Sequence, residues 1–203
     1  MVSGMVSAAI LAGGLSSRMG QNKALLEVGG QPIVERVLAR VREVAGGEVM
    51  IIANEREPYE YLGLPVYRDI IPHKGPLGGL YTALSHSGED HALVVSCDQP
   101  FLSVPLMDYL VGLRSEYDVV VPLNRDGYPQ SMYAVYSRGC IEPIRRRLAA
   151  DRLKVIGFYP DVRVREVAGE EIDQFDPERL SFFNVNTPGD LAEAETILRG
   201  LRP

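Results

Sequence analysis

The chain has few cysteines, no excess of positive charge and no long hydrophobic run, and each scarcity excludes a class of protein. Cys97 and Cys140 are far apart and form no Cys-x-x-Cys pair, so we expect a reducing compartment and no disulfide framework. A formal net charge of −6 argues against a nucleic-acid partner, since such domains carry a basic face. No run approaches the ~20 apolar residues that span a bilayer, and residues 1–7 lack the features of a signal peptide. We therefore expect a cytoplasmic protein with no membrane partner.

Histidine is also scarce, with three residues in the chain. His73 has no neighbour at metal-site spacing, and we interpret it, with His86 and His91, as an ordinary histidine rather than a ligand or a base. The length of 203 residues suits a single domain over residues 1–203. A domain of this size buries roughly 70% of the unfolded chain's surface, which is enough for a core without metal or disulfide.

Short apolar runs alternate with amphipathic segments along the chain, which predicts an α/β fold. The strand candidates are Val6–Leu11, Glu48–Ala53 and Ala92–Cys97, then Pro65–Arg68, Asp118–Pro122, Ser131–Tyr136 and Val162–Val167, the later ones nearer an edge. Helices are expected over 33–44 with Pro32 as first residue, and over Gly78–Ser85, Pro105–Ser115, Ile141–Ala149 and Pro188–Leu198. This order favours a three-layer sandwich: a doubly wound, mostly parallel sheet with helices on both faces. Ligands bind such folds beyond the C-terminal ends of the strands.

The segment Ala8–Lys23 combines an apolar strand with two glycines, two serines, an arginine and a lysine. Glycines without Cβ atoms let main-chain N–H groups approach a ligand, hydroxyls donate to phosphate oxygens, and the cations bring positive charge. The spacing fits neither the dinucleotide motif nor the Walker motif, and the glycines alone would suit a tight turn. The whole combination favours a triphosphate site. Its residues are Gly13, Gly14, Ser16, Ser17, Arg18 and Lys23.

Asp98 ends the apolar run Ala92–Cys97, where the sheet is expected to open onto its ligand crevice. Its carboxylate suits Mg²⁺, which favours one or two carboxylates together with phosphate oxygens. A capping role before Pro100 explains Asp98 equally well from its position alone.

Three further polar groups are candidates. Asn54 follows the strand 48–53, where an ordinary loop residue is an equally good interpretation, and Asp69 precedes the glycine-rich stretch 75–79. Asn184 and Asn186 precede Thr187, which we expect to cap the last helix. The densest basic run is Arg145, Arg146, Arg147, Arg152 and Lys154, which is typical of a solvated helix face.

The motif at 11–23, Leu-Ala-Gly-Gly-Leu-Ser-Ser-Arg-Met-Gly-Gln-Asn-Lys, resembles the signature of the molybdenum cofactor guanylyltransferases. Cys-Asp-Gln-Pro at 97–100 and Phe-Phe-Asn-Val-Asn-Thr-Pro at 182–188 are similar to two further motifs of that family, so the resemblance covers nearly the whole chain. Family members usually carry Asp where this chain has Asn22, a position that is not the metal ligand there. Gly13 is typical of the guanylyl members, whereas related cytidylyl enzymes tend to have Ala-Ala-Gly.

The resemblance implies a nucleotide-diphospho-sugar-transferase-like fold, and transfer of GMP from GTP to molybdopterin with release of pyrophosphate and Mg²⁺ as cofactor. It leaves room for transient contacts with other molybdenum-cofactor proteins, and for one or two cations of the basic run on the pterin phosphate. It implies that Lys23, Arg18 and Asp98 are catalytic and that Asp98 binds the metal. It implies that Asn184 and Asn186 bind the pterin. The nucleotide-binding residues that it implies are Leu11, Ala12, Gly13, Gly14, Lys23, Asn54, Asp69 and Asp98.

Two alternatives stay open. A cytidylyltransferase or sugar-phosphate nucleotidyltransferase of the same fold shares the opening motif in looser form. A non-catalytic GTP-binding adaptor is the second, although pure binding needs neither Lys23 nor a metal carboxylate at Asp98.

Overall fold

A seven-stranded sheet forms the centre of the protein in the computed structural model, which describes residues 5–13 and 22–201. The strand order is β5-β4-β1-β6-β8-β7-β9. All neighbouring pairs are parallel except those of β8, which runs antiparallel to β6 and β7. The strands are β1 Ser7–Leu11, β4 Val49–Ile52, β5 Val66–Tyr67, β6 His91–Ser96, β7 Val119–Pro122, β8 Tyr133–Ser137 and β9 Val164–Val167. The predicted mostly parallel α/β sheet is confirmed.

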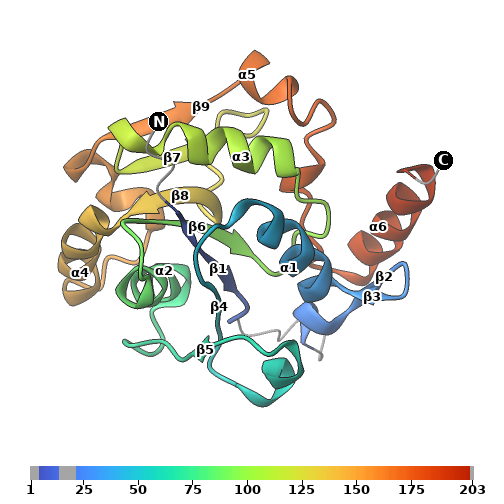
Figure 1. Cartoon of the computed structure of the whole chain (residues 1–203), viewed down its shortest axis with the longest axis horizontal. Coiled ribbons are helices and arrows are strands. Elements are labelled where there is room, and N and C mark those ends of the chain that lie inside the picture. Colours follow the sequence, from blue (N-terminus) through green and yellow to red (C-terminus); the bar gives the residue numbers. More distant parts are fainter. Residues whose placement is uncertain (1–4, 14–21, 202–203) are drawn as a thin grey trace.

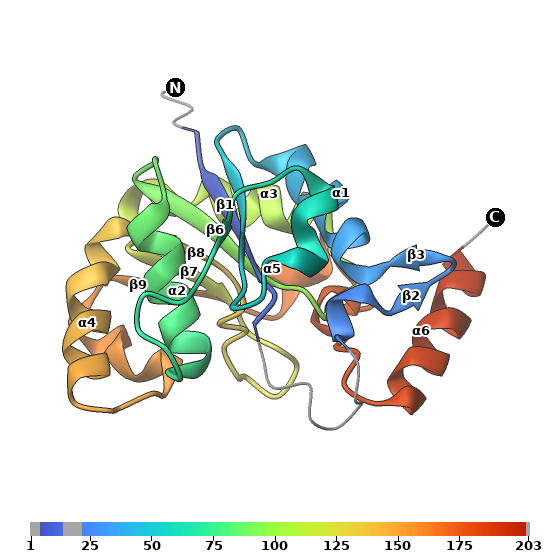
Figure 2. The ribbon, with the colours of Figure 1, turned by 90° about the horizontal axis from the view of Figure 1, so that it is seen from below.

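Helices cover both faces of the sheet, as Figures 1 and 2 show. On one face α1 (Ile33–Val44) and α3 (Val104–Gly112) pack over a core cluster that also takes in α5 (Glu170–Asp173) and α6 (Pro188–Leu201). On the other face α2 (Gly75–His86) and α4 (Ile141–Ala149) pack over a second cluster. The buried side chains of α1 recur at helical spacing, which is the amphipathic pattern that predicted this helix; they are Ile33, Val34, Val37, Leu38 and Val41.

The remaining elements are short. A ribbon of β2 (Glu27–Val28) and β3 (Gln31–Pro32) turns through two glycines with φ of 65° and 75°, the conformation that a two-residue hairpin favours. It lies beside α6 in both views, and the Gly29 N–H donates to the Glu195 carboxylate at 2.6 Å. The 3-10 helices are η1 Lys23–Leu25, η2 Glu57–Leu62, η3 Arg114–Glu116, η4 Arg138–Cys140, η5 Val155–Asp161 and η6 Leu180–Phe182.

All five expected helices are present, with shifts at the ends of some of them. The α4 helix has the predicted bounds, whereas α2 begins three residues early, at Gly75, and α3 stops at Gly112. Pro32 is the cap of α1 and part of β3 rather than the first helical residue, because its backbone has an extended ψ of 139°. Among the described residues, no helix has the length and apolar character needed to cross a membrane.

Candidate active site

The predicted nucleotide-binding residues meet where four parallel strands end. Because β1, β4, β5 and β6 run in one direction, the residues that follow them lie at the same edge of the sheet. Hydrogen bonds extend the pairing beyond the strands: the Ala12 N–H donates to the Ile52 carbonyl at 2.9 Å, and the Cys97 N–H donates to the Leu11 carbonyl at 3.1 Å. This edge therefore holds the ends of the three strands that precede Gly13, Asn54 and Asp98.

Asn54 and Asp69 form a reciprocal pair. The Asn54 Nδ2 donates to Asp69 Oδ2 at 2.9 Å, and the Asp69 N–H donates to Asn54 Oδ1 at 3.2 Å. Gly13 and Gly79 border this pair: a Cβ on Gly13 would lie 4.0 Å from Asn54 Nδ2, and one on Gly79 would lie 3.9 Å from Asp69 Oδ1. The pair joins the segment after β4 to the segment after β5 and fixes both side chains beside the exposed Gly13.

Gly13 has no φ in the left-handed region that favours glycine. The nearest atom to a Cβ there would be the Ile52 carbonyl oxygen, at an ordinary contact distance of 3.8 Å. Because Gly13 has no side chain, the main chain after β1 is accessible there.

Asp98 follows β6 and is half-buried. The Ser96 hydroxyl donates to Asp98 Oδ1 at 2.6 Å and orients the carboxylate. Within the described residues no three His, Cys, Asp or Glu side chains gather around a common point, so a metal here would take few ligands from the protein. That donor set suits Mg²⁺, which completes its shell with phosphate oxygens and water. Burial, with the neighbouring Asp98 charge, raises the pKa of the Cys97 thiol to about 12, so this thiol is not a nucleophile at neutral pH.

Lys23 connects the first motif to the last one. It is the first residue of η1, and its Nζ donates to Asn186 Oδ1 at 2.8 Å, across 163 positions of sequence. The start of α6 is fixed by a reciprocal cap: Thr187 Oγ1 accepts from the Asp190 N–H at 3.2 Å, while Asp190 Oδ2 accepts from the Asn186 and Thr187 N–H groups. The capping role expected of Thr187 is confirmed. These main-chain bonds, with a smaller contribution from the Lys23 charge, hold the pKa of the Asp190 carboxyl below its ordinary value.

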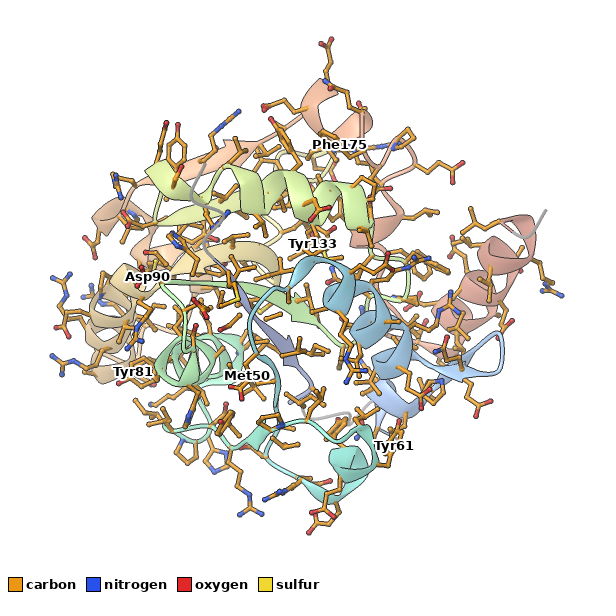
Figure 3. The ribbon with its side chains drawn as sticks, in the orientation of Figure 1. Met50, Tyr61, Tyr81, Asp90, Tyr133 and Phe175 are labelled. Carbon is orange, nitrogen blue, oxygen red and sulfur yellow. The ribbon has the colours of Figure 1, made fainter. Side chains whose placement is uncertain are left out.

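The segment before α6 is held against the loop that follows β6. The Val185 N–H donates to the Asp98 carbonyl at 2.9 Å, so Asn184 and Asn186 flank a residue bound to the candidate metal ligand. The Asn184 amide itself donates to the Phe182 carbonyl at 2.8 Å. Beneath the loop lies Tyr133 of β8, labelled in Figure 3, whose buried hydroxyl donates to the Ser103 carbonyl at 3.0 Å.

The basic run is separated from these asparagines. Figures 1 and 2 place α4, which carries most of it, on the side of the molecule away from α6. Arg145 pairs with Glu142 at 2.7 Å, and Arg146 lies 4.0 Å from Asp161. These exposed ion pairs agree with the solvated helix face that the run is typical of, and a role for one or two of its cations on the pterin phosphate stays a prediction.

Some predicted residues lie outside the described part of the chain, and some contacts escaped prediction. Gly14, Ser16, Ser17 and Arg18 are the expected residues outside the described ranges. Sequence reasoning missed two residues: Ser96, which donates to Asp98, and Tyr59, which donates to the main-chain carbonyl of Ala12. A hydroxyl two residues before the strand-end carboxylate was a usable signal for Ser96, whereas nothing local distinguishes Tyr59.

Parallel strand ends that carry Asp98 and the Asn54–Asp69 pair suit the binding of a nucleotide, and the comparisons with known proteins make the chain a nucleotidyltransferase. The 2-C-methyl-D-erythritol 4-phosphate cytidylyltransferase of Thermus thermophilus shares the fold, with a TM-score of 0.71, 20% identity, and coverage of 96% of this chain and 99% of that one. More specifically, residues 8–160 match the MobA-like NTP transferase domain, and the chain belongs to that family.

Two relatives agree with this assignment. The probable molybdenum cofactor guanylyltransferase of Pelotomaculum thermopropionicum is 44% identical over 193 residues, which cover 95% of this chain and 93% of that protein. The structure of molybdopterin-guanine dinucleotide biosynthesis protein A from Archaeoglobus fulgidus matches with a TM-score of 0.82 at 26% identity, over 97% of this chain and 100% of that one. The family resemblance inferred from the motifs is confirmed.

Proposed function

We propose that this protein transfers GMP from GTP to molybdopterin and releases pyrophosphate. The observation that carries the proposal is the bond between Lys23 Nζ and Asn186 Oδ1, which joins the glycine-rich signature to the C-terminal motif. The names of full-length relatives support the same activity. Residues 1–203 would form one nucleotidyltransferase domain, because the segment after β9 packs back onto the core through Ile172, Val185 and Ala194.

The two substrates would occupy neighbouring halves of the site. GTP would lie over the ends of β1, β4 and β5, against the Asn54–Asp69 pair and the main chain of the first motif. Molybdopterin would lie toward α6, where Asn184 and Asn186 supply amides. The proposed nucleotide-binding residues are Leu11, Ala12, Gly13, Gly14, Lys23, Asn54, Asp69 and Asp98.

The reaction needs positioning and charge stabilisation more than proton transfer. The terminal phosphate of molybdopterin would attack the α-phosphorus of GTP in line, forming one P–O bond as the bond to the β-phosphate oxygen breaks. This nucleophile is already ionised at neutral pH, so no general base is required. Consistent with this, His73 is exposed on a loop, His86 stacks on Tyr67 with ring centroids 3.8 Å apart, and His91 begins β6 at the opposite edge of the sheet.

The charge that develops on pyrophosphate is the main task left to the protein. Lys23 would neutralise part of it, and Arg18 is proposed to do the same. Asp98 would hold Mg²⁺, which when bound neutralises phosphate charge. Both cysteines have free thiols, as a protein of the reducing cytoplasm would have.

One assay tests this function. The protein is incubated with Mg²⁺, molybdopterin and each nucleoside triphosphate in turn, and pyrophosphate is measured. Release with GTP alone is expected, and omission of molybdopterin should abolish it. Release with CTP in place of GTP would favour the cytidylyltransferase, and GTP binding without any pyrophosphate would favour the adaptor.

A further inference from the structure

Tyr59 joins the two ends of the nucleotide-binding segment from a remote part of the chain. It lies on η2 and is 1% exposed, with its ring in the core cluster under α1. Its hydroxyl is 3.2 Å from the Ala12 carbonyl oxygen, 3.0 Å from Asn22 Nδ2 and 3.3 Å from Asn22 Oδ1. Ala12 and Asn22 stand on either side of residues 13–21, so one phenol binds both flanks of that stretch.

The chemistry of the groups assigns the direction of each bond. A phenol has one proton to donate, and the Ala12 carbonyl can only accept, so Tyr59 Oη donates there and accepts from Asn22 Nδ2. Asn22 Oδ1 is then free to accept the Ala24 N–H at 3.1 Å, which caps η1. The result is a chain of three bonds: Ala24 N–H to Asn22 Oδ1, Asn22 Nδ2 to Tyr59 Oη, and Tyr59 Oη to the Ala12 carbonyl. Burial raises the pKa of Tyr59 to about 12, so its proton is present at neutral pH.

Both partners of Tyr59 adjoin groups of the proposed site. Ala12 precedes the exposed Gly13, whose missing Cβ leaves the main chain open beside Asn54. Asn22 precedes Lys23, whose Nζ binds Asn186. A shift of either partner would move a phosphate-binding group, so the spacing between the two flanks depends on the phenol.

We propose that Tyr59 is a positioning residue that sets the distance between the Gly13 main chain and Lys23 and thereby organises the site for the triphosphate. This role rests on the proposed function only in that the Gly13 main chain and Lys23 bind the nucleotide. It requires no particular base and no particular acceptor.

The test compares two phenylalanine variants. Tyr59→Phe removes the hydroxyl and keeps the ring in the core. Tyr136→Phe is the matched control, because Tyr136 is also fully buried and its hydroxyl donates to a main-chain carbonyl, that of Ser131, at 2.7 Å on the α2–α4 face. Both should lower Tm by similar amounts. Only Tyr59→Phe should weaken the binding of the nucleoside triphosphate, by roughly tenfold, because without the hydroxyl the two flanks spend about a tenth of the time in the arrangement that binds, and the apparent affinity falls with that fraction.

A double-variant cycle tests the bond between the phenol and Asn22. Asn22→Ala removes the side chain that bonds to the phenol, so Tyr59→Phe should cost less affinity in that background than in the wild type, and the lost cap of η1 cancels between the two backgrounds. The affinity is measured for whichever triphosphate the wild type binds, without an acceptor, which separates this test from the guanylyl-transfer assay. Unchanged affinity in Tyr59→Phe, equal weakening in Tyr136→Phe, or strict additivity with Asn22→Ala would each overturn the proposal.

Discussion

Removal of the Lys23 ammonium should damage catalysis far more than stability. The Lys23 side chain is half-buried and its Nζ is bonded to Asn186 at 2.8 Å, so it lies between the two halves of the site. A unit charge about 4 Å from a phosphate oxygen contributes about 4 kcal/mol at an effective dielectric constant of about 20. Partial solvent exposure reduces this figure, and we expect Lys23→Ala to lose about 2–4 kcal/mol of transition-state stabilisation.

That loss corresponds to a fall of about 30- to 1,000-fold in turnover, since about 1.4 kcal/mol is a factor of ten. The assay is pyrophosphate release from GTP with Mg²⁺ and molybdopterin, run beside thermal unfolding. Arg40→Ala is the control for a lost positive charge: its guanidinium is exposed on α1 and pairs with Glu43. The reasoning fails if Lys23→Ala keeps more than a third of wild-type turnover, or if Arg40→Ala loses as much.

Three further outcomes are expected. Asp98→Asn should abolish Mg²⁺-dependent pyrophosphate release with little change in Tm, and a normal magnesium titration of that variant would remove Asp98 from the metal site. Gly78→Ala should destabilise the protein by about 1–3 kcal/mol, because the new Cβ would lie 2.9 Å from the Cβ of Lys74. Gly79→Ala is the control, since its new Cβ would meet its nearest neighbour at an ordinary 3.5 Å. Equal urea midpoints for the two variants would contradict this expectation. The Arg163 guanidinium holds the pKa of the Asp118 carboxyl below its ordinary 3.8, so this pair stabilises above about pH 4 and is lost as pH falls through the lowered pKa. Arg163→Gln should therefore be slightly less stable than the wild type at pH 6 and converge with it in acid. The difference should be small because the arginine is two-thirds exposed, and a gap that persists in acid unfolding would refute the linkage.

The predicted elements share a local origin. The helix over 33–44 follows from apolar residues at a 3.6-residue period, and the cap of α6 follows from Thr187 and Asp190 three positions apart. The strand ends that carry Asn54 and Asp98 follow from short apolar runs bounded by polar residues. Such signals involve residues that are close in the sequence, so they can be recognised without knowledge of the fold.

Apart from Ser96, which lies two residues before Asp98, the missed features depend on how distant parts of the chain pack. The reversed strand β8 has the same kind of apolar pattern as its parallel neighbours, so its direction is set by the connections around it rather than by its residues. The basic run is visible in the sequence, but the sequence did not show that α4, which carries most of it, packs on the face away from α6. Charge density alone carries no information about which side of a sheet a helix covers.

By itself the sequence determined the family, the alternation of strands and helices, and the chemical types available at each strand end. Only the tertiary structure decided which of these groups meet: Asn54 with Asp69, Lys23 with Asn186, and Tyr59 with both Ala12 and Asn22. The physical reason is that motifs and periods are properties of adjacent residues, whereas a contact across 163 positions depends on strand order and on how buried polar groups find partners.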